Sequence, residues 1–386
     1  MKILILKDVP GEIKAQKMTY NIQEIGLAIA LRKQGHECDV MCVSDDGKYH
    51  ESHVEIDGQH MTIFGMEAFV CLKNAWLSKK AYSIIDRYDI VQACEYNQIF
   101  TRHLAKKYQH KFICYHGPYY CKFNRKYNLM TKVFDLLFVQ RYRKLNTHFI
   151  TKSGLAADYL SSKGIRNVTP VGVGLNTSFL GSEIGETNDI IEEIKRLDGV
   201  KLLYIGVNEP RRNSLFMLDV SKKLKDTGLN LKLIMIGRFC NEEYKNLFFQ
   251  KVGDLGISKN IHYIPCMEQK YLAKVYKSCD VFLLPTIYDI YGMVLLESMY
   301  FGLPTITTVN GGSNMMIKHG ENGYVLTDFD ANNWAKHIKN VVCNKRLCLD
   351  IGENAHKTII ENFTWDKLAG KFIECYQSVL QQELYI

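Results

Sequence analysis

Short apolar runs alternate with longer segments of helical periodicity along the whole chain. This alternation is typical of parallel strands joined by crossover helices. In the first half the pattern predicts strands at Lys2–Leu6, Cys38–Val43, Ile90–Ala93, Phe112–Tyr115 and His148–Thr151. In the second half it predicts strands at Lys201–Gly206, Leu231–Gly237, Ile261–Ile264, Val281–Leu284 and Thr305–Thr308. The sequence therefore predicts an α/β protein with two doubly wound sheets.

Local signals refine this arrangement. Helical periodicity over Tyr20–Gln34 ends at Gly35, a residue common at helix ends, and Val54–Phe64 alternates around Asp57–Gly58 as a β-hairpin does. The polar, acidic stretch Gly181–Asp198 is interpreted as the break between domains. Because 386 residues exceed one ordinary core, we expect a first domain over 1–180, a second over 199–365 and a C-terminal helix within 366–386.

Composition narrows the class of protein. The hydrophobic content of 47% and the charged content of 23% are typical of a soluble globular protein, and no run approaches the ~20 apolar residues of a membrane span. The N-terminal run MKILILKDVPGE reads as a buried first strand rather than a signal peptide. The 12 cysteines show neither Cys-x-x-Cys nor zinc spacing, and we interpret them as buried thiols in a reducing cytoplasm.

The net charge of +8 suits an acidic partner, and no nucleic-acid-binding motif accompanies it. Basic residues concentrate between 119 and 144, where they interleave with aromatic and aliphatic residues and meet a single acid, Asp135. A basic amphipathic helix of this kind can lie on an anionic membrane surface. The alternative is a helix whose apolar side belongs to the core and whose basic side is solvated.

The segment PTIYDIYGMVLLESMYFGLP, residues 285–304, is the most informative for function. It holds two carboxylates, Asp289 and Glu297, eight residues apart, with Gly292 just before an apolar helical run. A glycine before a helix lets a ligand approach the backbone, and a helix N-terminus favours negative charge. This layout suits a ligand with phosphates in the middle and hydroxyls at both ends, such as a sugar nucleotide. The alternative is an ordinary α/β crossover with surface carboxylates.

This segment resembles the signature of the retaining glycosyltransferases of the family 4 type. The shared order is an apolar strand, Pro, a carboxylate, aromatic-Gly, an apolar helix, Glu and Gly-Leu-Pro. In that family both acids are Glu, whereas here the first is Asp289. Further segments fit the family in the same order: Gly35–His36, Tyr115–Pro118, Pro170–Asn176, Leu203–Gly206 and Gly311–Gly312. The resemblance implies the GT-B fold, in which two Rossmann-like domains face a cleft and a C-terminal helix crosses back onto the first domain.

The resemblance also implies roles for residues of the second domain. Asp289 would hold hydroxyls of the donor sugar, and Glu297 would accept hydrogen bonds from the ribose diol. Arg211 and Arg212 would bind the diphosphate, although Val207 stands where the family usually has another Arg. The backbone of the loop that leads into the helix would face the phosphates, which assigns to donor binding Ile290, Tyr291, Gly292 and Met293.

In the first domain the resemblance places His116 near the anomeric carbon as a catalytic residue together with Asp289. The family commonly has a Gly-Gly turn near its N-terminus, which this chain lacks, so Gly11 and Lys17 are the candidates there. Gly311–Gly312 is followed by Ser-Asn-Met, with Met315 where the family often carries Glu. These departures all concern ligand contacts.

We therefore expect a cytoplasmic, retaining glycosyltransferase, peripheral on the inner face of the membrane, that moves a sugar from a nucleotide-diphosphate-sugar donor to a glycan or lipid-linked acceptor. Such chemistry belongs to the synthesis of surface glycans, lipopolysaccharide or glycolipids. We expect no cofactor and no metal site, because no Asp-x-Asp motif follows a strand and arginines can balance the diphosphate charge. Two alternatives remain, a non-catalytic sugar-nucleotide or glycan-binding subunit and a nucleotide-sugar epimerase.

Overall fold

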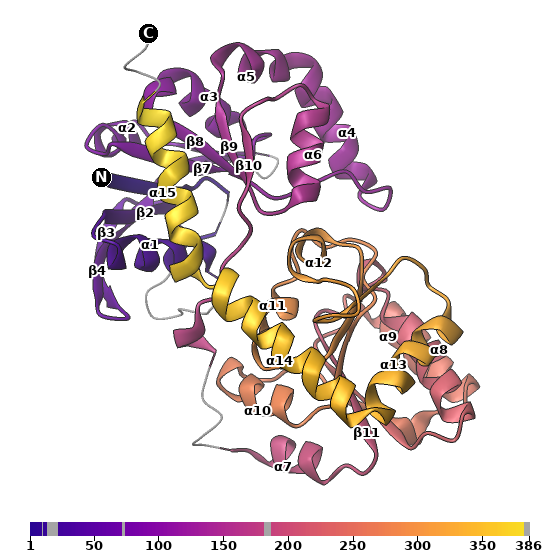
Figure 1. Cartoon of the computed structure of the whole chain (residues 1–386). Helices are drawn as coiled ribbons and strands as arrows, with labels where there is room; N and C mark the ends of the chain where they lie inside the picture. The colour runs from indigo at the N-terminus through magenta and orange to yellow at the C-terminus, as the bar shows by residue number, and fades with distance from the viewer. Residues whose placement is uncertain (10, 14–21, 72–73, 181–186, 382–386) are drawn as a thin grey trace. The chain divides into compact units, whose positions relative to one another are not determined.

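The computed structural model describes residues 1–9, 11–13, 22–71, 74–180 and 187–381. Contacts divide the chain into two compact units. The first unit comprises Met1–Asn176 and Phe363–Ile386, and the second comprises Thr177–Asn362. Each unit is a sheet of mostly parallel strands with helices packed on it (Figure 1).

The first unit is built on an eight-stranded sheet with the order β10-β9-β8-β7-β1-β2-β4-β3. All neighbouring strands are parallel except the β3–β4 hairpin. In chain order the strands are β1 (Lys2–Lys7), β2 (Glu37–Val43), β3 (His50–Ile56), β4 (Gln59–Met66), β7 (Ile90–Cys94), β8 (Phe112–His116), β9 (His148–Thr151) and β10 (Val168–Pro170). A separate hairpin pairs β5 (Ala68–Cys71) with β6 (Asn74–Leu77).

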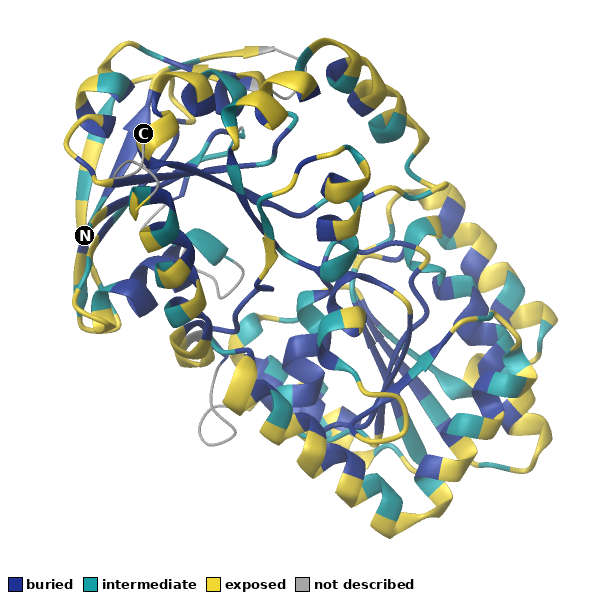
Figure 2. Cartoon of the chain, turned by 45° about the horizontal axis from the view of Figure 1, so that its top comes forward, coloured by how far each residue is buried: buried dark blue, intermediate teal, exposed yellow. Residues whose placement is uncertain are grey.

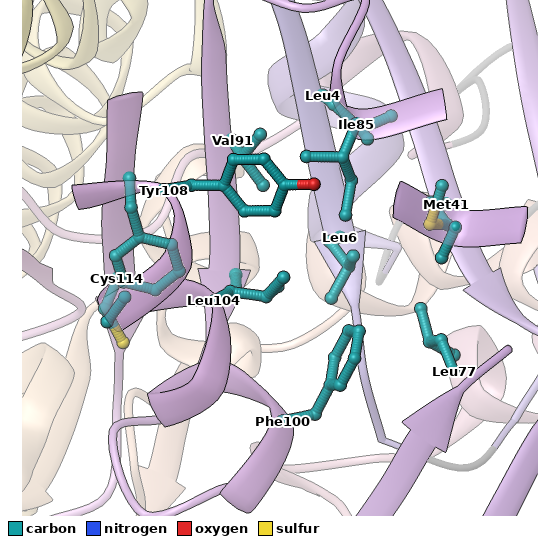
Figure 3. Close-up of a cluster of buried hydrophobic side chains, with 14 of the residues drawn as sticks. Leu4, Leu6, Met41, Leu77, Ile85, Val91, Phe100, Leu104, Tyr108 and Cys114 are labelled. Carbon is teal, nitrogen blue, oxygen red and sulfur yellow. The ribbon is translucent and has the colours of Figure 1, made fainter. Parts of the chain in front are cut away.

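Helices cover this sheet and close its main core. They are α1 (Gln23–Lys33), α2 (Lys80–Ile85), α3 (Ile99–Lys107), α4 (Arg125–Phe134), α5 (Gln140–Leu145), α6 (Gly154–Ser162) and α15 (Trp365–Gln381). Figure 3 shows part of the core, in which Leu6 and Val91 from the sheet lie near Phe100 and Leu104 from α3. These side chains are fully buried, so their apolar area drives the association of helices with the sheet.

The C-terminal helix α15 packs on α1 within the first unit. Its Tyr376 hydroxyl donates to Gln92 Oε1 of β7 over 2.8 Å. Trp365, at the start of α15, lies where a Cβ on Gly26 or on Gly174 would come within 2.3 Å or 2.5 Å of its ring. The two glycines therefore provide the space that the indole occupies.

The second unit has a six-stranded, wholly parallel sheet with the order β13-β12-β11-β14-β15-β16. Its strands are β11 (Val200–Ile205), β12 (Leu231–Ile236), β13 (Ile261–Ile264), β14 (Val281–Leu284), β15 (Thr305–Thr308) and β16 (Tyr324–Leu326). Its helices are α7 (Asp189–Arg196), α8 (Ser214–Asp226), α9 (Glu242–Asp254), α10 (Leu272–Lys277), α11 (Met293–Tyr300), α12 (Gly311–Met316), α13 (Ala331–Cys343) and α14 (Lys345–Asn362). Figure 2 shows buried strands in both units and helices with one exposed side.

The predicted strands are present, and each end lies within one residue of its predicted position. The prediction missed the short strands β5, β6, β10 and β16, whose three or four residues carry little periodicity. The sequence assigned the stretch 181–198 to the break between domains. Residues 181–186 lie outside the described ones, and the remainder contains α7, which packs against α10.

Two further expectations need correction. In the basic segment 119–144 the helix begins only at Arg125, and a π-helical turn, η3 (Asp135–Val139), interrupts its regular α-helical geometry between α4 and α5. Asp135 at this turn accepts from the Tyr96 hydroxyl over 2.9 Å and pairs with Lys163, so tertiary contacts hold it. The cysteines are not uniformly buried either. Cys240, Cys266 and Cys343 are exposed, since their segments lie at the surface of the second unit.

Candidate functional site

The strand order of the second unit reverses between β11 and β14, where successive connections leave toward opposite sides. In doubly wound sheets, ligands bind at such a switch point, outside the carboxyl ends of the strands. The turn after β11 carries Arg211 and Arg212, and the loop after β14 carries Asp289. The topology therefore brings together three of the residues that the sequence selected.

Direct contacts connect the two loops. The Arg212 guanidinium donates to Asp289 Oδ2, and the Arg211 guanidinium donates to the carbonyl of Tyr288 over 2.9 Å. The Ile287 amide also donates to the carbonyl of Arg211 over 2.9 Å. Asp289 is buried, with 7% of its surface exposed, so its pairing with Arg212 offsets the cost of removing the charge from water.

Arg211 and Arg212 differ in their remaining hydrogen-bonding capacity. Arg211 is held on two sides, because it also donates to Glu209 Oε1 over 2.6 Å. Arg212 Nε is buried and has no hydrogen-bond partner among the described residues. A buried N–H of this kind favours an additional acceptor, such as a phosphate oxygen.

Close backbone packing shapes the loop that follows Asp289. Gly292 has φ +78° and caps α11, a conformation that other residues rarely adopt. Gly312 in α12 packs so closely that a Cβ there would lie 1.9 Å from the carbonyl oxygen of Tyr291. The Gly311 amide donates to the carbonyl of Asp289 over 3.2 Å. The Gly311–Gly312 pair thus fixes the position of the loop.

Glu297 lies one turn into α11 but is not a surface acid, since only 1% of its surface is exposed. The hydroxyl of Tyr276 in α10 donates to Glu297 Oε2 over 2.9 Å. The side chain is therefore fixed by a neighbouring helix. The other donor-binding candidates, Ile290, Tyr291 and Met293, lie between Asp289 and the first turn of α11, and Tyr291 is buried.

The first unit has a corresponding switch point between β1 and β7. His116 ends β8 and is fully buried, with its Nδ1 2.8 Å from Glu95 Oε2. Lys152, which follows β9, places its Nζ 3.6 Å from Glu95 Oε1. The Gly117 amide donates to Glu95 Oε2 over 3.2 Å. A partly buried ion pair, Glu95 with Lys152, thus lies beside the fully buried His116, the catalytic candidate of the first domain.

The environment sets the charges of this cluster. Burial raises the pKa of the Glu95 carboxyl, but the charge of Lys152 and the contacts with His116 and the Gly117 amide outweigh it, so the pKa is lower than usual. Burial lowers the pKa of Lys152, yet Glu95 reverses the shift and the pKa is raised. Both groups are therefore ionised near neutral pH.

Asp8 follows β1 at the same edge and behaves differently. It is fully buried, and burial raises the pKa of its carboxyl to about 7. The Thr101 hydroxyl donates to Asp8 Oδ2 over 2.5 Å, while Oδ1 has no hydrogen-bond partner among the described residues. A carboxyl in such a site favours its neutral form.

Gly11 lies in the loop after β1, has φ +124° and accepts from Lys7 Nζ through its carbonyl over 3.0 Å. The other candidate of this loop, Lys17, lies outside the described residues. The sequence reasoning missed Asp8, Glu95 and Lys152. Each follows the carboxyl end of a predicted strand, and that position was the signal that could have identified them.

The basic segment presents a surface of mixed character. On α4 and η3 the exposed fractions are 66% for Leu129, 55% for Val133, 85% for Leu136 and 63% for Leu137. The basic residues of the segment are also exposed: Lys122, Arg125, Lys126, Lys132, Arg141, Arg143 and Lys144. In the part of the chain that the structure describes, no helix has the length and apolar character needed to cross a membrane.

Two family models match the chain. Residues 25–179 match the model "Glycosyltransferase Family 4", and residues 186–358 match the model "Glycosyl transferases group 1". The first match lies in the unit that holds His116, and the second includes Arg211, Arg212, Asp289 and Glu297.

Among curated relatives, N-acetyl-alpha-D-glucosaminyl L-malate synthase of Bacillus anthracis is 28% identical over 160 residues, which are 41% of this chain and 40% of that protein. The chain spans less than half the length of the first curated relatives that it matches.

The whole chain resembles solved structures. Sucrose-phosphate synthase from Thermosynechococcus elongatus aligns with a TM-score of 0.73 and 16% identity, over 99% of this chain and 100% of that one. Alr3699/HepE of Anabaena, in complex with UDP and glucose, aligns with a TM-score of 0.71 and 13% identity, over 98% of this chain and 100% of that one. At these identities the likeness shows the fold, which is that of the GT-B glycosyltransferases.

Proposed function

We propose that this chain, which belongs to the GT-B glycosyltransferases of the family 4 type, transfers a sugar from a nucleoside diphosphate sugar to an acceptor hydroxyl with retention of anomeric configuration. The observation that carries the proposal is the junction of the β11 and β14 loops. There Arg212 is paired with the buried Asp289, and Arg212 Nε retains an unsatisfied N–H. This junction offers cationic donors for a diphosphate directly beside a carboxylate for sugar hydroxyls.

In the proposed reaction the bond between the anomeric carbon and the diphosphate oxygen breaks, and the acceptor oxygen bonds to the same face of that carbon. The acceptor proton passes to the leaving phosphate. Negative charge develops on the diphosphate, which Arg211 and Arg212 stabilise because their guanidinium groups are already held in place. The proposal needs no covalent sugar–enzyme intermediate and no metal ion.

A uridine nucleotide is the first donor to try, because HepE, which shares the fold, was solved with UDP and glucose. We assign the ribose diol to Glu297, since its carboxylate is fixed by Tyr276 within the first turns of α11. A glycan or a lipid-linked sugar is the proposed acceptor, as in the synthesis of surface glycans, lipopolysaccharide or glycolipids.

The test is release of nucleoside diphosphate from a panel of nucleotide sugars, with candidate acceptors present and absent. The Asp289→Asn and Glu297→Gln variants keep the size of each side chain and remove its charge. We expect one donor to be turned over, and both variants to lose activity by about 100-fold. The matched control is Asp219→Asn, which removes a half-buried ion pair with Lys251 in the same unit.

The same assay separates the alternatives. Binding of a nucleotide sugar without release of the diphosphate, with every acceptor tried, would favour the binding subunit. Conversion of the donor to its epimer without an acceptor would favour the epimerase. Absence of any binding would reject the assignment of the site.

We also propose that the segment 119–144 lies on the anionic inner surface of the membrane, where it would meet a lipid-linked acceptor. Five large apolar side chains of α4 and η3, those of Leu129, Met130, Val133, Leu136 and Leu137, are exposed rather than packed in the core. This exposure argues against the alternative that the apolar side of the segment belongs to the core. The only acid of the segment, Asp135, is paired with Lys163 and does not neutralise the exposed cations. Apolar insertion and attraction to anionic lipid act together at such a surface.

Vesicle co-sedimentation tests this placement. We expect binding to phosphatidylglycerol vesicles that weakens with salt, and weak binding to phosphatidylcholine. Leu136→Asn with Leu137→Asn should reduce binding at least about 10-fold, since about two buried apolar side chains are lost. Leu349→Asn, at a residue 55% exposed in α14, is the control. Equal binding by all variants would exclude this surface.

A further inference from the structure

Arg102 of α3 packs against an aromatic ring of a neighbouring helical turn in the first unit. Its guanidinium carbon lies 4.3 Å from the centroid of the Phe138 ring in η3, which holds the cation over the aromatic face. Arg102 Nε is buried and has no hydrogen-bond partner among the described residues. A buried N–H of this kind carries a desolvation cost, so the position favours an additional acceptor.

A second arginine, Arg141, acts on Arg102 from the adjacent helix. Arg141 is exposed and is the second residue of α5, which contacts α3 (Figure 1). Burial, and then the charge of Arg141, lower the pKa of Arg102. Among the described residues neither arginine forms an ion pair, and Asp135, the acid of η3, pairs with Lys163 instead. Two neighbouring cations without a carboxylate favour an anion from outside the chain.

The shape of the guanidinium group favours phosphate as this anion. Each planar guanidinium presents a fork of N–H donors that fits a pair of oxygens. A carboxylate offers one such pair and fills one fork. A phosphate monoester offers three acceptor oxygens, so a single phosphate can contact both arginines.

Apolar side chains next to both arginines distinguish a lipid phosphate from a soluble one. Ile99, one helical turn before Arg102 in α3, is 43% exposed. Leu137, about one turn before Arg141, is 63% exposed. A soluble phosphate has no apolar part that could cover these side chains, whereas a phospholipid carries acyl chains beside its phosphate. The same pairing of cation and apolar side chain on two neighbouring helices therefore fits a lipid.

We propose that Arg102 and Arg141 bind the phosphate group of an anionic membrane lipid, with the apolar part of that lipid against Ile99 and Leu137. The inference rests on the membrane placement proposed above for residues 119–144, and it adds a specific headgroup chemistry and a second helix, α3. The phosphate supplies an acceptor for the buried Nε–H of Arg102 and offsets the repulsion between the two cations.

The test separates recognition of phosphate from attraction to negative charge. Two kinds of phosphatidylcholine vesicle are prepared, one with phosphatidic acid and one with oleate, mixed so that both have the same zeta potential. We expect the full-length wild-type protein to bind the phosphatidic acid vesicles at least about 10-fold more tightly, since hydrogen bonds to a shared charged group add to the general attraction. Co-sedimentation at constant ionic strength measures both affinities.

Lysine variants keep the net charge and remove the planar fork. Arg102→Lys and Arg141→Lys should each bring the affinity for phosphatidic acid vesicles close to that for oleate vesicles, and leave the affinity for oleate vesicles unchanged. Arg141 is exposed, so its variant tests the site without disturbing the fold. The matched control is Arg346→Lys in α14, whose side chain is 91% exposed, and it should keep the full preference.

A competition arm identifies the source of the phosphate. Inorganic phosphate, equal in concentration to the phosphatidic acid, should leave the preference intact because it lacks an apolar part. Loss of the preference under these conditions would overturn the assignment to a lipid in favour of a soluble phosphate compound.

The remaining outcomes separate this inference from the proposals on which it rests. Equal binding of wild type to both kinds of vesicle, or a full preference in both lysine variants, would overturn the phosphate site and retain the membrane placement. Binding to neither kind would overturn the placement and the site together. Sugar transfer is measured independently by release of nucleoside diphosphate, so its presence or absence changes none of these conclusions.

Discussion

The two units share one topology and use it for opposite electrostatic arrangements. Both sheets reverse their order next to the first strand of the unit, between β1 and β7 and between β11 and β14. In the first unit the edge carries two carboxyls, the buried Asp8 and the partly buried Glu95, and their pKa values shift in opposite directions. In the second unit it carries Arg211 and Arg212 beside Asp289.

This comparison shows that the fold provides the location and the side chains provide the chemistry. The cluster of the first unit is balanced internally, since Lys152 offsets Glu95 and His116 contacts it. In the second unit each arginine pairs with one acid, Arg211 with Glu209 and Arg212 with Asp289, but Arg212 Nε has no hydrogen-bond partner among the described residues. The groups at the first edge therefore balance one another, whereas the second edge keeps a buried N–H that favours a further acceptor.

The strongest test of this difference is Arg212→Met. It removes the cation that pairs with the buried Asp289. We expect a loss of turnover of at least about 100-fold and a destabilisation of about 3 kcal/mol. The double variant Arg212→Met with Asp289→Asn should recover stability and not turnover. Urea unfolding and nucleotide release measure the two effects. Full activity of the single variant would show that the second edge does not bind the diphosphate.

The second test concerns how the free energy of unfolding depends on pH, to which Asp8 of the first unit should contribute. Because the pKa of Asp8 is about 7 in the folded chain and 3.8 ordinarily, the folded state binds this proton more tightly than the unfolded state. The group therefore reduces stability as pH rises from about 4 to 7, by up to about 4 kcal/mol. Asp8→Asn should remove this fall in the free energy of unfolding. Urea unfolding at pH 5 and at pH 8 measures the difference.

Asp158→Asn, at an exposed position of α6, is the control for Asp8→Asn and should retain the slope. Glu95 changes the free energy of unfolding in the opposite direction, because its pKa is lowered in the folded chain. Its ionised carboxylate stabilises the fold at neutral pH, and this stabilisation is lost as the pH falls through the pKa of the folded chain. Equal slopes in wild type and Asp8→Asn would mean that this carboxyl is hydrated.

A third test concerns the packing that shapes the second edge. A Cβ at Gly312 would meet the Tyr291 carbonyl at 1.9 Å, so Gly312→Ala must displace the loop that holds Asp289. We expect a destabilisation of about 1–3 kcal/mol and a raised KM for the donor. Gly253→Ala, in α9 with nothing near its Cβ, should instead stabilise by about 0.5–1 kcal/mol. Similar behaviour of both variants in unfolding and kinetics would contradict the close approach.

The smallest effect is expected at Glu209. Glu209→Gln weakens one contact of Arg211, which keeps its bond to the Tyr288 carbonyl. Because the pair is about a quarter exposed, stability should change by less than about 1 kcal/mol. Donor KM should change less than about fivefold. A loss as large as that of Arg212→Met would indicate that Arg211 is the principal phosphate ligand.

Much of this organisation could be predicted from periodicity. The strands of the structure begin and end within one residue of the predicted positions. They could be predicted because a buried parallel strand is apolar along its length. Asp289, Glu297, Arg211 and Arg212 could be selected as candidates because they lie in local patterns after strands. Glu95 and Lys152 were missed because their significance depends on contacts across β8, between residues 57 positions apart.

The sequence by itself determined the two α/β repeats, their strand positions and the concentration of basic charge between 119 and 144, because these follow from local composition and spacing. Only the tertiary structure decided that Glu297 is buried against Tyr276, that Leu136 is exposed at a π-helical turn, and that His116 contacts Glu95. Burial and charge pairing arise between segments distant in sequence, so no local pattern records them.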